Sequence, residues 1–220
     1  MRVAFFDFDH TLLNGDSNML WYAYLLDAGL ISSADWARHE RFMWDYGQGT
    51  LDFSALQDFR QRVDAALAPE LLRAHRHAFA VSRLLPQLSA LLKDRVRYHH
   101  QRGDRLAIVS ATRRCLIEEA AWALGIPALI TAEPERLING LSCFAEGKVA
   151  HVEAWLAARG WSLPSLAESW FYSDSHNDLP LLLAVSHPVA VAPDDMLRLH
   201  AGQRGWPVIA RAEAVLEAQY

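Results

Sequence analysis

The sequence predicts an α/β fold, in which a parallel β-sheet lies between two layers of helices and an all-helical segment follows the first strand. Three observations lead to this prediction. The run Val3–Phe6 is apolar without alternation, which is typical of a parallel strand covered on both faces. From about residue 88 onward, strand patterns alternate with helix patterns. Between these parts, residues 15–87 show helical spacing of apolar and aromatic side chains and no convincing strand.

The segment from residue 88 onward reads as a regular succession of elements. The predicted order is helix 87–101, strand 105–110, helix 112–124, strand 128–131, helix 147–159, strand 169–173, helix 178–185, strand 189–192 and strand 206–209. Gly125 and Pro127 mark the end of one helix, and Asn139-Gly140 is typical of a hairpin turn. Strands that alternate with helices favour a parallel sheet with helices on both faces, which is a three-layer, Rossmann-like core.

The all-helical segment is punctuated by familiar signals. Ser32-Ser33 is typical of a helix start, Gly47-Gln48-Gly49 indicates a break, and Pro69 suits the first turn of a further helix. An insertion after the first strand lies over the strand ends, so we expect it to roof any site there. We divide the chain into an α/β core of residues 1–14 and 88–220 and an inserted all-helical cap domain of residues 15–87.

The composition excludes several classes of protein. The chain has 220 residues, of which 52% are hydrophobic, and a formal net charge of -5, so nothing indicates a nucleic-acid groove or an anionic membrane surface. No segment reaches the ~20 apolar residues of a membrane helix, and no signal peptide is evident. Cys115 and Cys143 show neither metal spacing nor a disulfide framework. We expect a cytoplasmic protein; the sequence fixes no oligomeric state.

Two acids follow the first strand directly. Asp7 and Asp9 lie where the strand ends, and Thr11 follows them. The carboxyl ends of parallel strands are where open α/β sheets bind ligands. Carboxylates this close repel each other unless a proton or cation lies between them, and Mg²⁺ is the usual cation where phosphate is handled. The alternative is a strand end followed by an Asp-rich turn.

Further polar residues follow later strands. Ser110, Ala111 and Thr112 come at the end of one strand and suit an anion, although an ordinary helix cap has the same pattern. Lys148 opens a helix, where its charge is unfavourable unless an anion is near; a solvated surface lysine is the alternative. Asp174 and Asp178 follow another strand, and the alternative there is an acidic helix N-terminus.

The order of these residues carries a resemblance. Asp7-x-Asp9-x-Thr11, Ser110, Lys148 and Asp174-x-x-x-Asp178 resemble, in order and spacing, the four motifs of the haloacid dehalogenase-like phosphatases. The insertion resembles the cap of their phosphoserine-phosphatase-like branch, subfamily IB, in which histidinol phosphatases also fall. Three segments resemble that branch: Gly49-x-Leu51-x-Phe53, Arg62-Val63 and Asn177-Asp178-Leu179-Pro180. Two residues depart from the pattern: His10 replaces a small residue, and Ser173 replaces a glycine.

The resemblance implies a mechanism. Asp7 would attack phosphorus and become an aspartyl-phosphate, and Asp9 would act as general acid and then as general base. Mg²⁺ would be bound by Asp7, the main-chain carbonyl of Asp9 and Asp174, with support from Asp178. Four residues would bind phosphoryl oxygens: Ser110, Ala111, Lys148 and Asn177. The family's ATP-driven pumps have threonine where this chain has Asp9, so the acid favours hydrolysis.

The resemblance also suggests a substrate class, a small phosphorylated metabolite. Asp16 would face an amino group and Arg62 a carboxylate, as suits phosphoserine or histidinol phosphate; the alternative is a helix cap and an exposed arginine. Aromatic residues of the cap either line the pocket or, as helical spacing favours, form its core: Trp21, Phe42, Trp44 and Phe53. We expect the histidines at 75, 77, 99 and 100 to lie on exposed helix faces and to bind no zinc.

Three other functions stay open from sequence. A phosphotransferase of the same fold would pass the phosphoryl group to a sugar or alcohol. A non-catalytic regulatory module would bind a phosphorylated ligand, but degenerate members are expected to have lost Asp7 or Asp9, and this chain keeps both. A receiver domain also uses a strand-end aspartate and Mg²⁺ but needs no long helical insertion.

Overall fold

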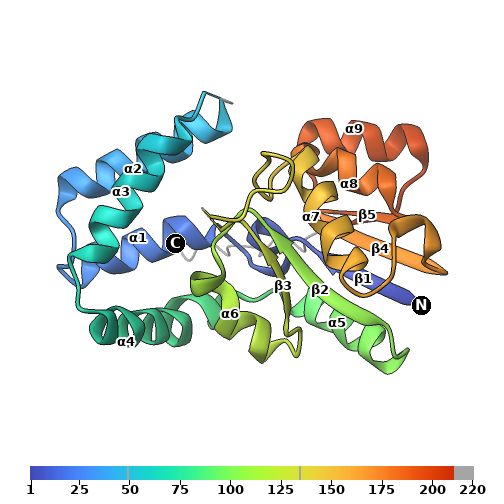
Figure 1. Cartoon of the computed structure of the whole chain (residues 1–220), viewed down its shortest axis with the longest axis horizontal. Helices are drawn as coiled ribbons and strands as arrows, with labels where there is room; N and C mark the ends of the chain where they lie inside the picture. Colours follow the sequence, from blue (N-terminus) through green and yellow to red (C-terminus); the bar gives the residue numbers. More distant parts are fainter. Residues whose placement is uncertain (49, 134, 211–220) are drawn as a thin grey trace, which may run out of the picture.

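The computed structural model describes residues 1–48, 50–133 and 135–210, and within them the strands form one parallel sheet (Figure 1). Its order is β3-β2-β1-β4-β5-β6, and every neighbouring pair is parallel. The strands are β1 (Arg2–Phe6), β2 (Arg105–Ser110), β3 (Ala128–Thr131), β4 (Glu168–Ser173), β5 (His187–Val191) and β6 (Val208–Ile209). The predicted parallel sheet is confirmed.

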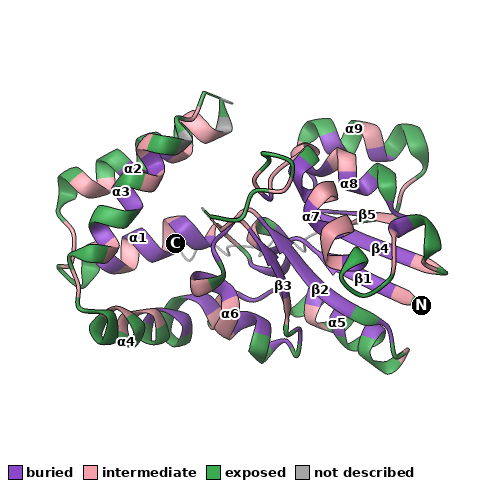
Figure 2. Cartoon of the chain, viewed as in Figure 1, coloured by how far each residue is buried: buried purple, intermediate pink, exposed green. Residues whose placement is uncertain are grey.

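Helices cover both faces of this sheet. One face packs against α5 (Ala90–Gln101) and α6 (Arg114–Ala123), and the other against α7 (Glu146–Ala157), α8 (Leu179–Ala184) and α9 (Asp195–Arg204). Alternate residues of β1 enter the two layers, because successive side chains of a strand point to opposite faces: Ala4 and Phe6 join the first cluster, and Val3 and Phe5 the second. The strands are therefore buried almost throughout (Figure 2), and the three-layer architecture is confirmed.

The helix α9 was not predicted from sequence. Its start carries an ordinary signal, since the carboxylate of Asp194 accepts a 2.8 Å hydrogen bond from the N–H of Leu197. The helix ends at Gly205, whose φ of 66° is the left-handed conformation that glycine adopts without strain. The polar composition of the segment concealed it, because it buries only Leu197 and Ala201.

Four of the described helices between β1 and β2 in the sequence stand together beyond the carboxyl ends of the strands (Figure 1). They are α1 (Ser17–Asp27), α2 (Ser33–Gly47), α3 (Phe53–Ala65) and α4 (Pro69–Phe79). Local chemistry fixes their starts: Asp16 and Asp52 cap α1 and α3, and Ser32 forms a reciprocal capping box with Asp35. We refer to this group as the cap.

The chain leaves the sheet and returns to it at one place. Leu13 and Leu88 form an antiparallel bridge, and the Ser89 N–H donates a 2.8 Å hydrogen bond to the Leu12 carbonyl. These contacts lie beside the predicted boundaries of the cap domain at residues 15 and 87. The division into two domains stays a prediction.

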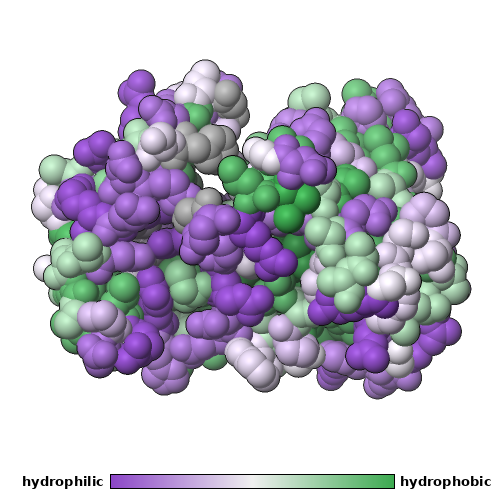
Figure 3. All heavy atoms as spheres, in the orientation of Figure 1, coloured by the Kyte–Doolittle hydropathy of each residue, from purple (hydrophilic) through white to green (hydrophobic). Residues whose placement is uncertain are grey.

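The aromatic residues of the cap mostly fill its interior. Trp21 and Phe42 are buried in a cluster that continues into the α5 side of the sheet, whereas Trp44 is 65% exposed. The side chain of Phe53 and residue Gly49 lie outside the described part. On the face drawn in Figure 3, hydrophilic residues cover most of the cap surface. The core alternative therefore holds for Trp21 and Phe42.

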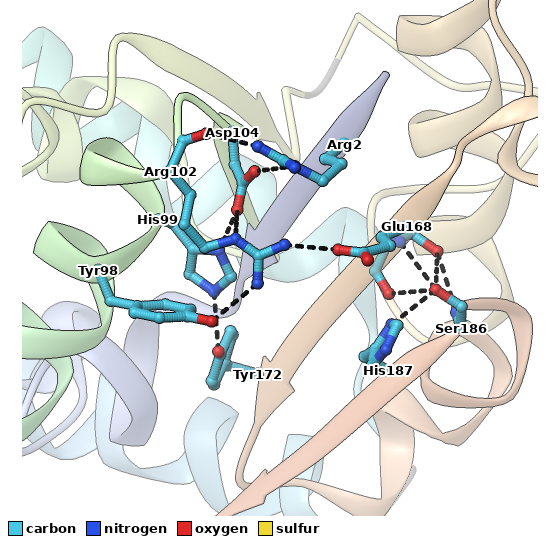
Figure 4. Close-up of polar contacts among 10 residues, drawn as sticks. Arg2, Tyr98, His99, Arg102, Asp104, Glu168, Tyr172, Ser186 and His187 are labelled. Atoms are coloured by element: carbon cyan, nitrogen blue, oxygen red, sulfur yellow. Dashed lines mark hydrogen bonds and ion pairs between the residues drawn. The ribbon is translucent and has the colours of Figure 1, made fainter.

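His99 is not on an exposed face, and that prediction is wrong. The imidazole is fully buried under the sheet, 2.8 Å from Asp104 and 2.8 Å from the hydroxyl of Tyr172 (Figure 4). The last turn of α5 packs directly on the strands, so the face that carries His99 points inward. His77, by contrast, is exposed and pairs with Glu119. None of the described helices has the length and apolar character needed to cross a membrane.

Candidate active site

The ends of three neighbouring strands border one cavity. Strand β1 lies between β2 and β4, so Asp7, Ser110 and Asp174 come together where the strand order changes direction. The cap helices close the other side, leaving a cavity of about 170 Å³. Among its lining residues are Asp7, Asp9, Asp16, Asn18, Met43, Tyr46, Leu51, Leu56, Arg60, Ser110, Ala111, Thr112, Ser142, Phe144, Lys148, Asp174, Asn177 and Asp178. The predicted roofing of the site by the cap matches this geometry.

Asp7 and Lys148 form the buried centre of the cavity wall. The Lys148 ammonium group lies 2.9 Å from Asp7 and 2.7 Å from Asp178. Burial raises the pKa of Asp7 well above its usual value; Lys148 opposes that rise, and the Asp178 and Asp174 carboxylates add to it. For Lys148, burial lowers the pKa, but the two carboxylates outweigh it and raise the pKa overall. The two carboxylates thus explain a lysine near a helix N-terminus.

Gly147 permits the close approach that brings Lys148 into place. A Cβ atom at this position would lie 1.8 Å from the main-chain carbonyl oxygen of Ser142. The N-terminus of α7 therefore packs directly against the loop that carries Ser142 and Phe144, both of which line the cavity. Only glycine fits here, since a main-chain oxygen cannot move aside as a flexible side chain can.

Both carboxylate oxygens of Asp9 accept hydrogen bonds. One of its oxygens accepts a 2.6 Å hydrogen bond from the Ser17 N–H, and the other a 2.7 Å bond from the Thr112 hydroxyl. Burial, with a smaller contribution from the Asp16 charge, raises the pKa of Asp9 to about 6, although the hydrogen bonds from Ser17 and Thr112 oppose the rise. A carboxyl group in this range can both give and take a proton near neutrality.

The departure at position 10 falls on an unusual backbone conformation. His10 has φ 54°, in the left-handed region that glycine adopts without strain and that histidine enters more often than most other residues, and its N–H donates to the Gly15 carbonyl at 2.9 Å. The turn reverses the chain between Asp9 and α1. It places Ser17 where its N–H reaches the Asp9 carboxylate.

Asp174 and Asp178 are held by hydroxyl groups. Thr11 donates a 2.9 Å hydrogen bond to Asp174, which ties the first loop to the end of β4. Ser173, the second departure from the family pattern, is fully buried and donates a 2.7 Å bond to Asp178. The serine hydroxyl therefore orients the acid that contacts Lys148, a contact that glycine cannot make.

The acids of the cavity suit a hard cation. Burial, together with the charge of Asp178, raises the pKa of both Asp7 and Asp174, and Lys148 contacts only two of the three carboxylates. The negative charge that remains is what a divalent cation offsets. Within the described residues, no three His, Cys, Asp or Glu side chains could hold a metal ion by themselves. A cation here also needs main-chain, water or substrate oxygens as ligands. Mg²⁺ is usually bound in this way, by one or two carboxylates together with such oxygens.

The remaining predicted phosphate ligands also border the cavity. Ser110, Ala111 and Asn177 are among its lining residues. The Ser110 hydroxyl oxygen accepts a 3.0 Å hydrogen bond from the Thr112 N–H, so its hydrogen is free to point elsewhere. The N–H of Asn177 donates to the Ser175 hydroxyl at 3.2 Å, which fixes the loop.

Of the two predicted substrate residues, one lines the cavity and the other does not. Asp16 lines the cavity, and one of its oxygens caps α1 by accepting a 2.9 Å bond from the Met19 N–H. Arg62 lies on the outer face of α3 instead, where it is exposed and pairs with Asp35 at 2.8 Å. Arg60 is the buried arginine that lines the cavity, so the placement expected for Arg62 is corrected.

Several lining residues were missed in the sequence. Asn18, which no sequence pattern singles out, contacts Thr112 at 2.9 Å. The apolar part of the lining comes from Met43, Tyr46, Leu51, Leu56 and Phe144 rather than from the aromatics that stood out by spacing. No signal in the sequence marks these side chains, because helix periodicity alone does not tell which face meets the core and which meets a cavity.

Most of this chain matches one known protein family. The model of the haloacid dehalogenase-like hydrolases matches residues 4–183. A histidinol-phosphatase of Neisseria meningitidis serogroup C (strain 8013) is 36% identical over 217 residues, covering 94% of this chain and 98% of the relative. A phosphoserine phosphatase of Mycobacterium tuberculosis (strain ATCC 25618 / H37Rv) is 26% identical over 229 residues, covering 94% of this chain and 70% of the relative.

Solved structures share the fold of this chain. A crystal structure of a protein with unknown function from Bordetella pertussis Tohama I matches with a TM-score of 0.86 and 39% identity, covering 94% of this chain and 97% of that one. A substrate-bound phosphoserine phosphatase matches with a TM-score of 0.60 and 17% identity, covering 94% and 91%, and shows a common fold. By the match over residues 4–183 and the 36% identical relative, this chain belongs to the haloacid dehalogenase-like hydrolases.

Proposed function

We propose that this hydrolase is a magnesium-dependent phosphomonoesterase that acts on a small metabolite through an aspartyl-phosphate on Asp7. The observation that carries the proposal is the convergence of Asp7, Asp9 and Lys148 on one cavity at the strand ends. Phosphatases among the relatives support the reaction class.

The first step transfers the phosphoryl group to the enzyme. A carboxylate oxygen of Asp7 attacks phosphorus, the ester P–O bond breaks, and the departing alkoxide oxygen takes the proton of Asp9. The products are the free alcohol and a phosphorylated Asp7. Lys148, 2.9 Å from Asp7, offsets negative charge that develops on the phosphoryl oxygens.

The second step returns the enzyme to its starting state. Asp9, now a carboxylate, accepts a proton from a water molecule whose oxygen attacks phosphorus. The bond between phosphorus and Asp7 breaks, the Asp7 carboxylate is restored, and inorganic phosphate leaves. Bound by Asp7, Asp174 and the main-chain carbonyl of Asp9, with Asp178 in support, Mg²⁺ would offset the charge of the phosphoryl group.

The cap side of the cavity suits an amino-containing substrate. Asp16 presents a carboxylate to the cavity for an amino group, and histidinol phosphate is the first candidate because of the 36% identical relative. Phosphoserine is the second, and Arg60 favours it, because this buried arginine lines the cavity. Its guanidinium group would donate to a substrate carboxylate.

A phosphate-release screen tests the proposal. The chain is incubated with histidinol phosphate, phosphoserine, a sugar phosphate and a nucleotide monophosphate, with Mg²⁺ and after chelation. We expect phosphate release that depends on Mg²⁺ and prefers one of the two amino-containing esters. A phosphorylated acceptor formed when an alcohol is added, with no free phosphate in its absence, would indicate a phosphotransferase, and binding without release a regulatory module.

A pair of variants isolates the nucleophile. Asp7→Asn removes the attacking carboxylate and is expected to abolish release, whereas Asp58→Asn alters an exposed cap acid and should keep wild-type turnover. Full activity of the Asp7 variant would refute the assignment. Cleavage of a nucleotide while both amino-containing esters stay intact would remove the role given to Asp16.

A further inference from the structure

A chain of four hydrogen-bonded side chains runs from the cap to Asp9. Arg60 donates to the Asn18 side-chain oxygen at 3.2 Å, and the Asn18 amide nitrogen donates to the Thr112 hydroxyl at 2.9 Å. Thr112 in turn donates to Asp9 at 2.7 Å. Arg60, Asn18 and Thr112 are all at least nine-tenths buried. The chain thus connects an arginine of the cap that lines the cavity to the residue proposed as acid and base.

The direction of this chain is fixed by chemistry. A guanidinium group can only donate, so Arg60 holds the Asn18 oxygen as acceptor and leaves the Asn18 nitrogen to donate. Since Thr112 accepts from that nitrogen, its own hydrogen is directed to Asp9. Each link therefore determines the next, and reversal of any one would break its neighbour.

Asp9 accepts hydrogen bonds from both the cap and the core. The Ser17 N–H, at the start of cap helix α1, contacts one carboxylate oxygen, and Thr112, just after β2, contacts the other. The Ser17 hydroxyl also lies 3.3 Å from the Thr112 hydroxyl. With both oxygens held, the carboxylate plane cannot rotate freely. The orientation of the Asp9 carboxylate therefore depends on the packing of α1 against the core.

The groups that hold Asp9 carry no charge. Within residues 1–48, 50–133 and 135–210, no ion pair involves Asp9. The Lys148 ammonium group contacts Asp7 and Asp178 instead. Neutral donors orient a carboxyl group without committing it to the anionic form as strongly as a cation would. That arrangement suits a group that must first give a proton and then take one.

We propose that Thr112 and Asn18 are positioning residues that hold the Asp9 carboxyl group toward the leaving-group oxygen. The inference rests on the function proposed above, because it assumes that Asp9 is the acid and base. Arg60 then has a second effect: by fixing the Asn18 amide, it links substrate binding at the cap to the orientation of Asp9 in the core.

Two esters with different leaving groups test this role. Thr112→Val keeps the shape and removes the hydroxyl, and Thr112→Ser keeps the hydroxyl. With histidinol phosphate, or phosphoserine if only that ester is cleaved, we expect Thr112→Val to lower kcat roughly 10- to 100-fold at similar KM. With p-nitrophenyl phosphate, whose leaving group needs no proton, kcat/KM should stay within about threefold of wild type. Thr112→Ser should restore both values.

A matched control and a second variant complete the design. Thr131→Val makes the same change at a buried threonine at the end of β3, which does not line the active-site cavity, and should leave both esters unaffected. Asn18→Asp replaces the amide donor by an acceptor that competes for the Thr112 hydrogen, so it should reproduce the loss of kcat. It also decides the matter if Thr112→Val fails to fold.

The outcomes separate this inference from the proposed function. An inactive Asp9→Asn variant beside a Thr112→Val or Asn18→Asp variant with wild-type kcat would overturn the positioning role alone. Equal losses on both esters, with no rescue by Thr112→Ser, would also overturn it, because they would indicate general damage to the site. An Asp9→Asn variant with full turnover would instead refute the proposed function.

Discussion

The ammonium group of Lys148 lies 2.9 Å from the Asp7 carboxylate, although the two residues are 141 positions apart in the chain. Both are buried, so the contact is little screened by water. Lys148 also contacts Asp178 at 2.7 Å, which makes it the common partner of the proposed nucleophile and an acid of the last motif.

Removal of this lysine is expected to impair both catalysis and folding. In Lys148→Met, Asp7 and Asp178 lose their shared cation, and the free energy of unfolding at pH 7 should fall by about 3 kcal/mol, because buried carboxylates are left unpaired. Without positive charge beside the phosphoryl group, kcat should drop at least about 100-fold. Urea unfolding and phosphate release measure the two effects. Lys93→Met, on α5, is the control and should match wild type in both.

The two arginines of α3 should separate in substrate affinity. Arg60→Met removes a buried guanidinium from the cavity and is expected to raise KM about tenfold, because a substrate anion loses a charged donor. Arg62→Met removes an exposed ion pair with Asp35, worth no more than about 1 kcal/mol, and should leave KM unchanged. Steady-state kinetics on phosphoserine and histidinol phosphate would contradict this account if the effects were exchanged.

The arginine pair shows why the cap side of the site was harder to predict than the core side. Residues two positions apart on a helix point about 200° apart, so Arg60 faces the cavity while Arg62 faces water. An alignment error of two positions therefore moves the predicted arginine from the cavity to the exposed face of the helix. His99 and Trp44 were misplaced for the same reason, since nothing in a helical pattern says which face its neighbours cover.

The core side of the site was predictable because the sheet topology places the residues that follow each strand next to one another. In a parallel sheet the residues after each strand meet at one edge, so Asp7, Ser110 and Asp174 came together as soon as the strands were recognised. Lys148 depends on more: its reach to Asp7 requires the close packing of α7 at Gly147, which the sequence shows only as a glycine before a lysine.

That glycine provides a sharp test of the packing. In Gly147→Ala, the new methyl group would lie 1.8 Å from the Ser142 carbonyl oxygen, so α7 or the loop must move and carry Lys148 with it. We expect a loss of more than about 2 kcal/mol in unfolding free energy and a clear drop in kcat. Gly202→Ala, in α9, has open space around its Cβ and should be neutral or slightly stabilising. Similar behaviour of the two variants would contradict the assigned contact.

The buried cluster around His99 predicts a pH dependence of stability that is independent of the active site. His99 lies 2.8 Å from Asp104 and 2.8 Å from the Tyr172 hydroxyl beneath the sheet (Figure 4). Burial lowers the pKa of His99 below its usual 6.5, and the nearby Asp104 carboxylate opposes this shift without reversing it. The folded protein therefore keeps this imidazole neutral at a pH where the unfolded chain would already protonate it.

The sign of the effect follows from that difference. Below about pH 6.5 the unfolded state binds a proton that folded His99 does not, so the unfolding free energy falls on acidification, by at most about 1.4 kcal/mol per pH unit. His99→Gln cannot titrate, so its curve between pH 7.5 and pH 5.5 should be flatter than that of wild type. His100→Gln, at an exposed neighbour, should retain the wild-type slope. Urea unfolding at several pH values measures all three, and parallel curves for wild type and His99→Gln would show that the imidazole does not stay neutral.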